Sequence, residues 1–212
     1  NGVSEIGGYL TKNPNLFKEA TTILNEVTGN NISNINGDIE VFGKRADFIL
    51  ANENGINLNG ATFINTNGVT LTTGSPIITN NSVDFNINKG NINLNGVGTS
   101  GNYFNVLAKT INIYKEISSL KAENDPNISL IAGENKITLS KTNLANPVIK
   151  DSKNTTSDKY GIYATNLGAM YGKNIRLIST DKGLGVRHEG IISSSEDIEI
   201  SSSGDITISN LA

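Results

Sequence analysis

The stretch Gly90-Asn91-Ile92-Asn93-Leu94 carries the pattern from which the fold of this chain can be predicted. The stretch Lys109-Thr110-Ile111-Asn112-Ile113 repeats it, with Ile111 standing 19 residues after Ile92. A turn residue is followed by apolar and polar residues in alternation, which is typical of a short strand with one buried face. Further copies lie at 39–41, 56–58, 69–71, 137–139, 175–177, 198–200 and 206–208. The chain is therefore predicted to be all-β.

The spacing of these copies favours a solenoid. Ile137 follows Ile111 by 26 residues, Ile175 follows Ile137 by 38 (twice 19), and Ile198 follows Ile175 by 23. Short strands at a loose period of about 20 residues bury their apolar faces only by stacking in successive coils. We therefore expect a right-handed parallel β-helix with short extra-helical elements, in a single domain over residues 1–212. At about 4.8 Å per coil, roughly nine or ten coils would make a rod of about 45 Å.

A β-sandwich is the alternative fold. Sandwiches space their strands at about 8 to 12 residues and usually have longer strands with more aromatic residues. Only 6% of this chain is aromatic, whereas it holds 33 Asn and 22 Gly. Gly and Asn tolerate the positive φ that coil corners need, and Asn side chains on successive coils can hydrogen-bond in ladders. The composition thus agrees better with the solenoid.

Two segments depart from the strand pattern. Residues 17–27 could form one or two helical turns, which Gly29 would end. Residues 141–160 are polar and include Asn146-Pro147, so we expect an exposed loop or extra-helical insertion there. Strands resume at Gly161-Ile162-Tyr163.

Composition also limits the functions that the chain can perform. A formal net charge of −3 argues against nucleic-acid binding, which needs a basic surface. No apolar run approaches the 18 or so residues of a transmembrane helix. The chain has no Cys, and its one histidine, His188, excludes a metal site with two or more His ligands. We expect no cofactor and no metal.

The acidic residues give little support to catalysis, because a glycosidase needs two facing carboxylates. The Asp residues are scattered without an Asp-Asp pair. Asp197 and Asp205, or Glu199 and Asp205, could face each other on adjacent coils, but a solvated polar face explains them better. No catalytic residue is predicted, and the chain is not expected to be an enzyme.

Residues 7–74 contain several motifs in a fixed order. Two of them are Asn13-Pro14-Asn15-Leu16 and Asn52-Glu53-Asn54-Gly55-Ile56. Together with Gly7-Gly8-Tyr9-Leu10 before them and Thr70-Leu71-Thr72-Thr73-Gly74 after them, this block resembles the secretion domain of two-partner secretion exoproteins. That family includes filamentous-haemagglutinin-like adhesins and contact-dependent inhibition proteins. Glu53 replaces the Pro of the second family motif, which is otherwise Asn-Pro-Asn-Gly-Ile.

The resemblance implies that the chain is the N-terminal secretion domain of a large adhesin or toxin-delivery exoprotein. Such a protein is secreted or held at the bacterial surface after crossing the periplasm. It is recognised by the POTRA domains of an outer-membrane β-barrel transporter, and the domain nucleates β-helix folding outside. Other regions would contact host or neighbouring cells. Residues 75–212 would continue the β-helix beyond the motif block.

The resemblance also supplies candidate site residues. We call Asn13–Leu16 the first tag and Asn52–Ile56 the second tag. Each tag either contacts the transporter or stabilises a turn of the fold, and the sequence leaves both roles open. The candidate residues are Asn13, Pro14, Asn15, Leu16, Asn52, Asn54, Gly55 and Ile56.

Relatives often carry a Cys pair just after the second tag, where this chain has Leu58 and Ala61. We expect these two residues to form a packed apolar contact. Three aromatic residues farther along, Tyr103, Phe104 and Tyr114, are expected to stack in the core. Two other functions remain as alternatives: a carbohydrate-active β-helix enzyme, which would show facing carboxylates in a groove, and a purely structural adhesin shaft.

Overall fold

The computed structural model describes residues 2–120, 125–141, 143–150 and 158–211, and the regular secondary structure of these residues is all β. A seven-stranded sheet holds β22 (Ile198–Ser202), β20 (Ile175–Ser179), β14 (Asn127–Ala132), β12 (Tyr103–Ala108), β8 (Thr66–Thr72), β6 (Ala46–Ala51) and β3 (Thr22–Glu26), in this order. A nine-stranded sheet holds β18 (Tyr160–Ala164), β21 (Gly185–Ser194), β19 (Met170–Gly172), β13 (Thr110–Ser119), β11 (Asn91–Thr99), β7 (Ile56–Ile64) and β4 (Ser33–Ile35), with β23 (Ile206–Leu211) on β21 and β5 (Ile39–Glu40) on β7.

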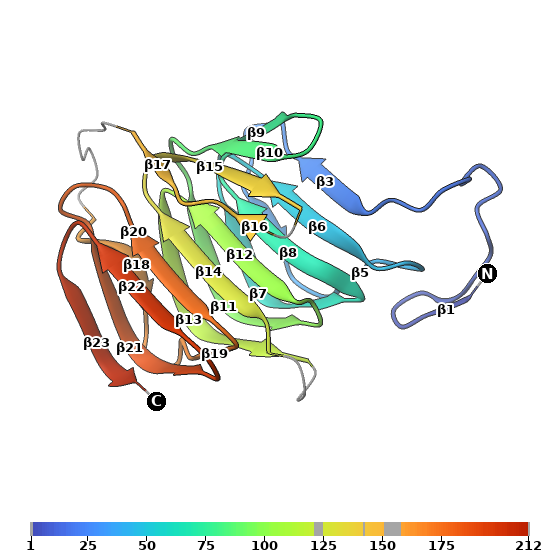
Figure 1. Cartoon of the computed structure of the whole chain (residues 1–212). Helices are drawn as coiled ribbons and strands as arrows, with labels where there is room; N and C mark the ends of the chain where they lie inside the picture. Colours follow the sequence, from blue (N-terminus) through green and yellow to red (C-terminus); the bar gives the residue numbers. More distant parts are fainter. Residues whose placement is uncertain (1, 121–124, 142, 151–157, 212) are drawn as a thin grey trace.

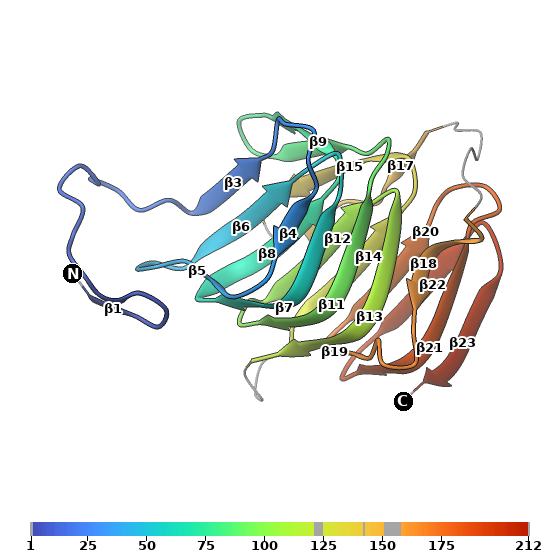
Figure 2. The same cartoon turned by 180° about the vertical axis from the view of Figure 1, so that it is seen from behind.

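The strands of these two sheets pair in parallel with their equivalents in the next coil. Ile56, Ile92 and Ile111 are directly aligned on β7, β11 and β13. The chain alternates between the two sheets, so that successive coils stack into a β-helix (Figures 1 and 2). The predicted parallel β-helix is confirmed.

The longest strands bend and cover two sides of each coil. The first half of β7 pairs with β4 and its second half with β5, and the bend falls at Gly60, whose φ is +69°. Gly96, with φ +87°, takes the equivalent place in β11. Glycine adopts such positive φ values without steric cost, which explains why Asn-Gly recurs in the sequence at these points.

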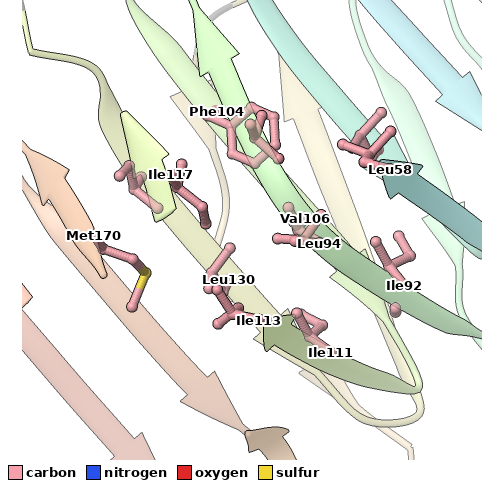
Figure 3. Close-up of a cluster of buried hydrophobic side chains, with 14 of the residues drawn as sticks. Leu58, Ile92, Leu94, Phe104, Val106, Ile111, Ile113, Ile117, Leu130 and Met170 are labelled. Atoms are coloured by element: carbon pink, nitrogen blue, oxygen red, sulfur yellow. The ribbon is translucent and has the colours of Figure 1, made fainter. Parts of the chain in front are cut away.

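Apolar side chains fill the interior of the β-helix. At the inward-facing positions of the strands, a buried apolar side chain recurs from one coil to the next. Figure 3 shows Ile92, Leu94, Ile111 and Ile113 in this arrangement. The aromatic rings of Phe48, Phe63 and Phe104 also pack in a row at tilted angles, with neighbouring centroids 5.7 and 6.2 Å apart. Leu58 and Ala61 belong to the same core and are almost fully buried.

The expected asparagine ladder lies on the outer face of the nine-stranded sheet. The Nδ2 group of Asn112 donates to Oδ1 of Asn93 (2.9 Å), Asn93 donates to Asn57 (2.8 Å), and Asn57 donates to Asn34 (2.8 Å). These bonds satisfy side-chain amides that project from four successive coils.

A third, antiparallel sheet lies outside the coils, and we call it the cover sheet. It contains β9 (Ser75–Ile78), β10 (Val83–Asn86), β15 (Asn135–Ser140), β16 (Asn143–Leu144) and β17 (Val148–Ile149). Phe85 and Ile137 of the cover sheet pack on Ile49, Leu107 and Ile131, which point outward from the seven-stranded sheet. Strands of that sheet are thus buried on both faces, and the adjacent apolar pairs Ile49-Leu50, Val106-Leu107 and Leu130-Ile131 are the sequence signal for it.

The cover sheet explains why the chain forms fewer coils than the spacing predicts. The spacing places Ile137 in a coil between Ile111 and Ile175, but it lies in β15, and Ile111 pairs with Ile162, 51 residues later. The excursion through β15 therefore uses residues that the periodicity assigns to a coil. Each coil contributes one strand to the seven-stranded sheet. The described residues therefore form seven coils, and the prediction of nine or ten coils was wrong.

Residues 17–27 contain no helix, which contradicts the sequence expectation. Thr22–Glu26 form β3, which pairs in parallel with β6, and Leu24 packs against the core under the cover sheet. The β-branched residues Thr21, Thr22 and Ile23 favour this extended structure. Within the described part of the chain, no helix is long and apolar enough to cross a membrane.

Two further expectations concern the polar segment and the aromatic residues. Residues 141 and 143–150 lie outside the coils, in β16, β17 and their connections, whereas Tyr160 already begins β18; residues 142 and 151–157 fall outside the described residues. Tyr103 and Phe104 are buried, but Tyr114 is 42% exposed, so its expected place in the core was wrong. Tyr114 directly follows the inward-facing Ile113, and alternation along β13 turns it outward.

We predict that replacing Leu107 with Ala lowers the free energy of unfolding by about 2–5 kcal/mol, because it leaves a cavity under the cover sheet. Leu107 is fully buried there. Urea denaturation followed by circular dichroism measures the change. Ile78→Ala, at a side chain that is 70% exposed, is the matched control. A Leu107 variant no less stable than that control would contradict the buried interface.

Candidate functional site

The first tag forms an exposed turn between the N-terminal hairpin and β3. The backbone N–H of Leu16 donates to the carbonyl of Asn13 (3.2 Å), and the N–H of Asn15 donates to Oδ1 of Asn13 (2.9 Å). Pro14 occupies the position where a fixed φ favours such a turn. Leu16 is 50% exposed and the next residue, Phe17, is 95% exposed. The tag therefore presents apolar side chains to solvent.

The first tag borders a hollow of about 590 Å³. Asn13 and Leu16 line one side of it, Val3 lies on the N-terminal hairpin, and Phe42 follows β5. The remaining lining residues are mostly polar: Gly2, Glu5, Thr11, Lys12, Glu19, Glu40, Gly43 and Asn65. The hollow thus combines three apolar side chains with a mostly polar lining, and a partner would need both apolar and hydrogen-bonding groups to fill it.

Glu40 attaches the N-terminal hairpin, formed by β1 (Gly2–Ser4) and β2 (Gly8–Leu10), to the first coil. Its carboxylate accepts hydrogen bonds from the hydroxyl of Ser4 (2.5 Å) and from the backbone N–H groups of Glu5 and Ile6 (3.1 Å each). The Ser4 hydroxyl first, and then the N–H groups, hold the pKa of Glu40 below its ordinary value. Elsewhere the hairpin projects beyond the stack of coils (Figures 1 and 2).

The second tag is a buried corner between β6 and β7. Asn52 is 1% exposed, and its Nδ2 group donates to the carbonyl of Asn31 (2.9 Å) and the hydroxyl of Ser33 (2.8 Å) in the preceding coil. Its Oδ1 accepts the backbone N–H of Asn54 (3.0 Å), and its carbonyl accepts the N–H of Gly55 (3.1 Å). Asn52 is thus fully engaged within the fold.

The rest of the second tag connects the coil before it with the coil after it. Asn54 donates from Nδ2 to the carbonyl of Gly29 (2.8 Å). Gly55 has φ +123°, and a Cβ added there would lie 2.8 Å from the carbonyl oxygen of Asn91 in the following coil. Ile56 is fully buried in the core. The carboxylate Oε2 of Glu53 lies 3.8 Å from the Nζ of Lys89.

The structure does not bring the two tags together. The first tag borders the N-terminal hairpin and the loop after β5, whereas the second tag contacts Gly29, Asn31, Ser33 and Asn91. Sequence reasoning missed Ser4, Glu40 and Asn65, which shape the surroundings of the first tag. Ser4 and Glu40 are 36 residues apart, so no local signal connects them.

The residues considered for catalysis do not converge on one site. His188 is fully buried, and desolvation lowers its pKa. Glu199 lies on β22 and pairs with Arg176 (3.0 Å), while Asp205 precedes β23 in the other sheet, so these two carboxylates do not face each other on adjacent coils. Among the described residues, no group of three or more His, Asp or Glu is placed to hold a metal ion.

Comparison with known proteins places this geometry in a family. The family model of the TPS secretion domain matches residues 9–208. The chain belongs to the TPS secretion domain family. The crystal structure of the filamentous hemagglutinin secretion domain superimposes with a TM-score of 0.88 at 34% identity, covering 100% of this chain and 78% of that one.

Curated relatives of this TPS domain include long bacterial proteins. Filamentous hemagglutinin of Bordetella pertussis is 40% identical over 98% of the chain, and the protein adenylyltransferase and cysteine protease IbpA of Histophilus somni is 41% identical over 97%. The 16S rRNA endonuclease CdiA of Enterobacter cloacae is 33% identical over 98%. The chain spans only 5–6% of the length of these relatives.

Family membership confirms the resemblance drawn from the motif block, and it implies an outer-membrane transporter as partner. Exoproteins with a TPS domain are secreted or surface-exposed after passing through the periplasm. The comparisons do not assign a role to either tag.

We predict that Gly55→Ala lowers the free energy of unfolding by about 1–3 kcal/mol, because alanine is strained at this positive φ and its Cβ would collide with Asn91. Gly37→Ala is the matched control, since a Cβ at Gly37 meets nothing within 4 Å. Urea denaturation of both variants gives the comparison. Equal stability of the two variants would contradict the corner geometry.

The docking of the N-terminal hairpin should depend on pH. Because the folded-state pKa of Glu40 lies below 4.5, its contribution is complete above that pH and is lost as the pH falls through the lower folded-state value. We expect the amide NMR signals of Glu5 and Ile6 to move toward unbonded values as the pH falls below 4.5 and through the folded-state pKa of Glu40. In Glu40→Gln this transition should disappear. A transition that persists in the Gln variant would mean that another group controls docking.

Proposed function

We propose that the chain is recognised by its outer-membrane transporter through the first tag and the adjoining hollow, and that the second tag serves the folding of the β-helix. The observation that carries this division is the difference in exposure of the tags. Asn52 is buried with its amide bonded inside the fold, whereas Leu16 of the first tag is exposed and borders a hollow, and the next residue, Phe17, is also exposed. In the second tag Asn52, Gly55 and Ile56 are buried, so the first tag offers a partner the more accessible side chains.

The chemistry of the first-tag surface fits an extended, partly apolar segment of the transporter. Val3, Leu16 and Phe42 offer apolar contact area, and the exposed Phe17 adds an aromatic side chain of the kind that dominates protein interfaces. We assign the contact to the periplasmic POTRA domains of the transporter, because the exoprotein meets them before it crosses the outer membrane.

The second tag would act after export, when the coils assemble. Its hydrogen bonds join Gly29, Asn31 and Ser33 of one coil to Asn52 and Asn54 of the next. Such a corner favours the stacking of early coils, on which later coils then add. This role accounts for the burial of Asn52 and Ile56 without any external partner.

The domain itself would be non-enzymatic, and adhesion or toxin delivery would belong to other parts of a longer protein. Support comes from the small share of each relative that the chain covers and from the family description, which names secretion alone. A carbohydrate-active enzyme is not favoured, since the carboxylates considered for it lie apart. The remaining alternative is a purely structural shaft, and the export experiment below distinguishes it from recognition by a transporter.

The test is export of the natural exoprotein, co-expressed with its transporter, in variants of the two tags. Asn13→Ala with Leu16→Ala should lower the exported amount about tenfold, as expected when contacts at the centre of an interface are lost, with no change in the melting temperature of the purified domain. Asn52→Ala should lower the melting temperature, because it removes several buried hydrogen bonds.

The matched control is Val148→Ala, an exposed residue of the cover sheet far from both tags in sequence. It should change neither export nor stability. Normal export of the Asn13/Leu16 variant would refute recognition through the first tag and favour the structural shaft. If the unaltered protein were not exported by any transporter encoded with it, the secretion role itself would fail.

A further inference from the structure

The path of the chain after β14 is not dictated by the local sequence. In the preceding coil, β12 ends at Ala108, a corner follows at Lys109, and β13 begins at once in the nine-stranded sheet. After β14 ends at Ala132, Gly133 and Glu134 precede residues Asn135–Ser140, which carry the same alternating pattern. Yet they leave the helix as β15, and β18 pairs with β13 instead. Two strands therefore compete for one edge of β13.

The first excursion has a local explanation that the second lacks. There the chain leaves the helix after β8, and β9 contains Pro76, which has no N–H to donate within a parallel sheet. Asn135–Ser140 contains no proline and carries Ile137 and Leu139 at the positions that a coil strand needs. The sequence of β15 itself therefore does not exclude it from the coils.

A buried polar cluster surrounds the point where the chain leaves. We call Lys109, Glu134, Asn135, Thr180 and Asp181 the exit cluster. The Nζ of Lys109 lies 2.6 Å from Oε1 of Glu134 and 2.6 Å from Oδ2 of Asp181. The Lys109 and Asp181 side chains are only 6% and 1% exposed. Charges this deeply buried are costly to leave without partners.

The exit cluster holds the two residues that start the excursion. The backbone N–H of Glu134 donates to Oδ1 of Asp181 (2.7 Å), and Nδ2 of the fully buried Asn135 donates to the hydroxyl of Thr180 (3.0 Å). Lys109 belongs to the coil before the exit, whereas Thr180 and Asp181 follow β20 in the coil after it. The exit residues are thus held from both sides.

Burial disfavours the charged form of Lys109, but its hydrogen bonds to Asp181 and Glu134 outweigh that effect and raise its pKa. Lys109 therefore remains a cation that requires these carboxylates. Turning the chain at Glu134 toward β13 would carry the Glu134 carboxylate and the Asn135 amide away from their partners. The inward path would lose interactions that the outward path keeps.

We propose that the exit cluster directs the chain out of the helix after β14, and thereby decides that β18 rather than β15 pairs with β13. This selection between two registers also supplies the cover sheet, because β15 provides Ile137 and Leu139 over the outward-facing Ile131. Buried polar groups that select one register at the expense of another are known from coiled coils.

The absence of Cys from the chain permits a direct test. Asn112 is aligned with Tyr163 in the observed register. If Ile137 aligned with Ile111 instead, Asn112 would face Thr138. A chain with Asn112→Cys, Thr138→Cys and Tyr163→Cys offers the thiol at position 112 two possible partners, and aligned neighbouring strands are close enough for a disulfide. Refolding under oxidising conditions, followed by peptide mapping, gives the ratio of the 112–138 link to the 112–163 link.

In this three-cysteine background, the neutral variant Lys109→Met/Glu134→Gln/Asp181→Asn should raise that ratio at least about tenfold over the unaltered cluster. Lys109→Arg, which keeps the cation, should leave it unchanged. The matched control is Lys173→Met/Glu196→Gln, which removes an exposed ion pair between neighbouring coils and should also leave it unchanged.

An unchanged ratio in the neutral variant would overturn the proposal and reduce the exit cluster to an ordinary buried ion pair. A rise of the same size in the Lys173/Glu196 control would also overturn it, since charge removal in general would then loosen the register. If the neutral variant does not refold, Asp181→Asn alone, which keeps the Lys109–Glu134 pair, provides the decision: a raised ratio supports the proposal and an unchanged one refutes it.

Discussion

The parallel pairing of each coil with the next is the interaction on which the rest of this structure depends. A single strand such as β11, which holds Ile92, is not stable alone, and Ile92 is aligned with Ile56 on one side and Ile111 on the other. The bends of the long strands and the cover sheet are both arranged around these stacked coils. The bends at Gly60 and Gly96 turn the strands from one side of the coil to the next, and the cover sheet packs over the outward-facing apolar side chains of the seven-stranded sheet.

The sequence predicted the repeating unit well, because the repeating unit is local. Alternation around Ile92 and Ile111, together with Asn-Gly at the bends, determines strand, face and turn within a few residues. The aligned pairs Ile92–Ile111 and Ile175–Ile198 follow directly from their spacing. The motif block added the family, which composition and periodicity alone do not provide.

What the sequence did not predict depends on contacts between distant residues. Ile137 carries the coil pattern but is excluded from the coils, and the partners of Glu134 that accompany this exclusion lie 25 residues before it and 47 residues after it. The Ser4–Glu40 attachment of the N-terminal hairpin is equally distant. For the first tag, the turn was predictable from Asn-Pro-Asn, but the hollow beside it was not, since Val3 and Phe42 come from separate segments.

The asparagine ladder has a direction. From Asn112 through Asn93 and Asn57 to Asn34, each side chain donates its N–H to the residue of the coil before it. A coil that has already formed thus presents an unshared amide oxygen along its edge, and the next coil arrives with the hydrogen that this oxygen accepts. When coils form in order from the N-terminus, growth of the rod is then a templated addition, in which each completed coil specifies where the following one begins to bond.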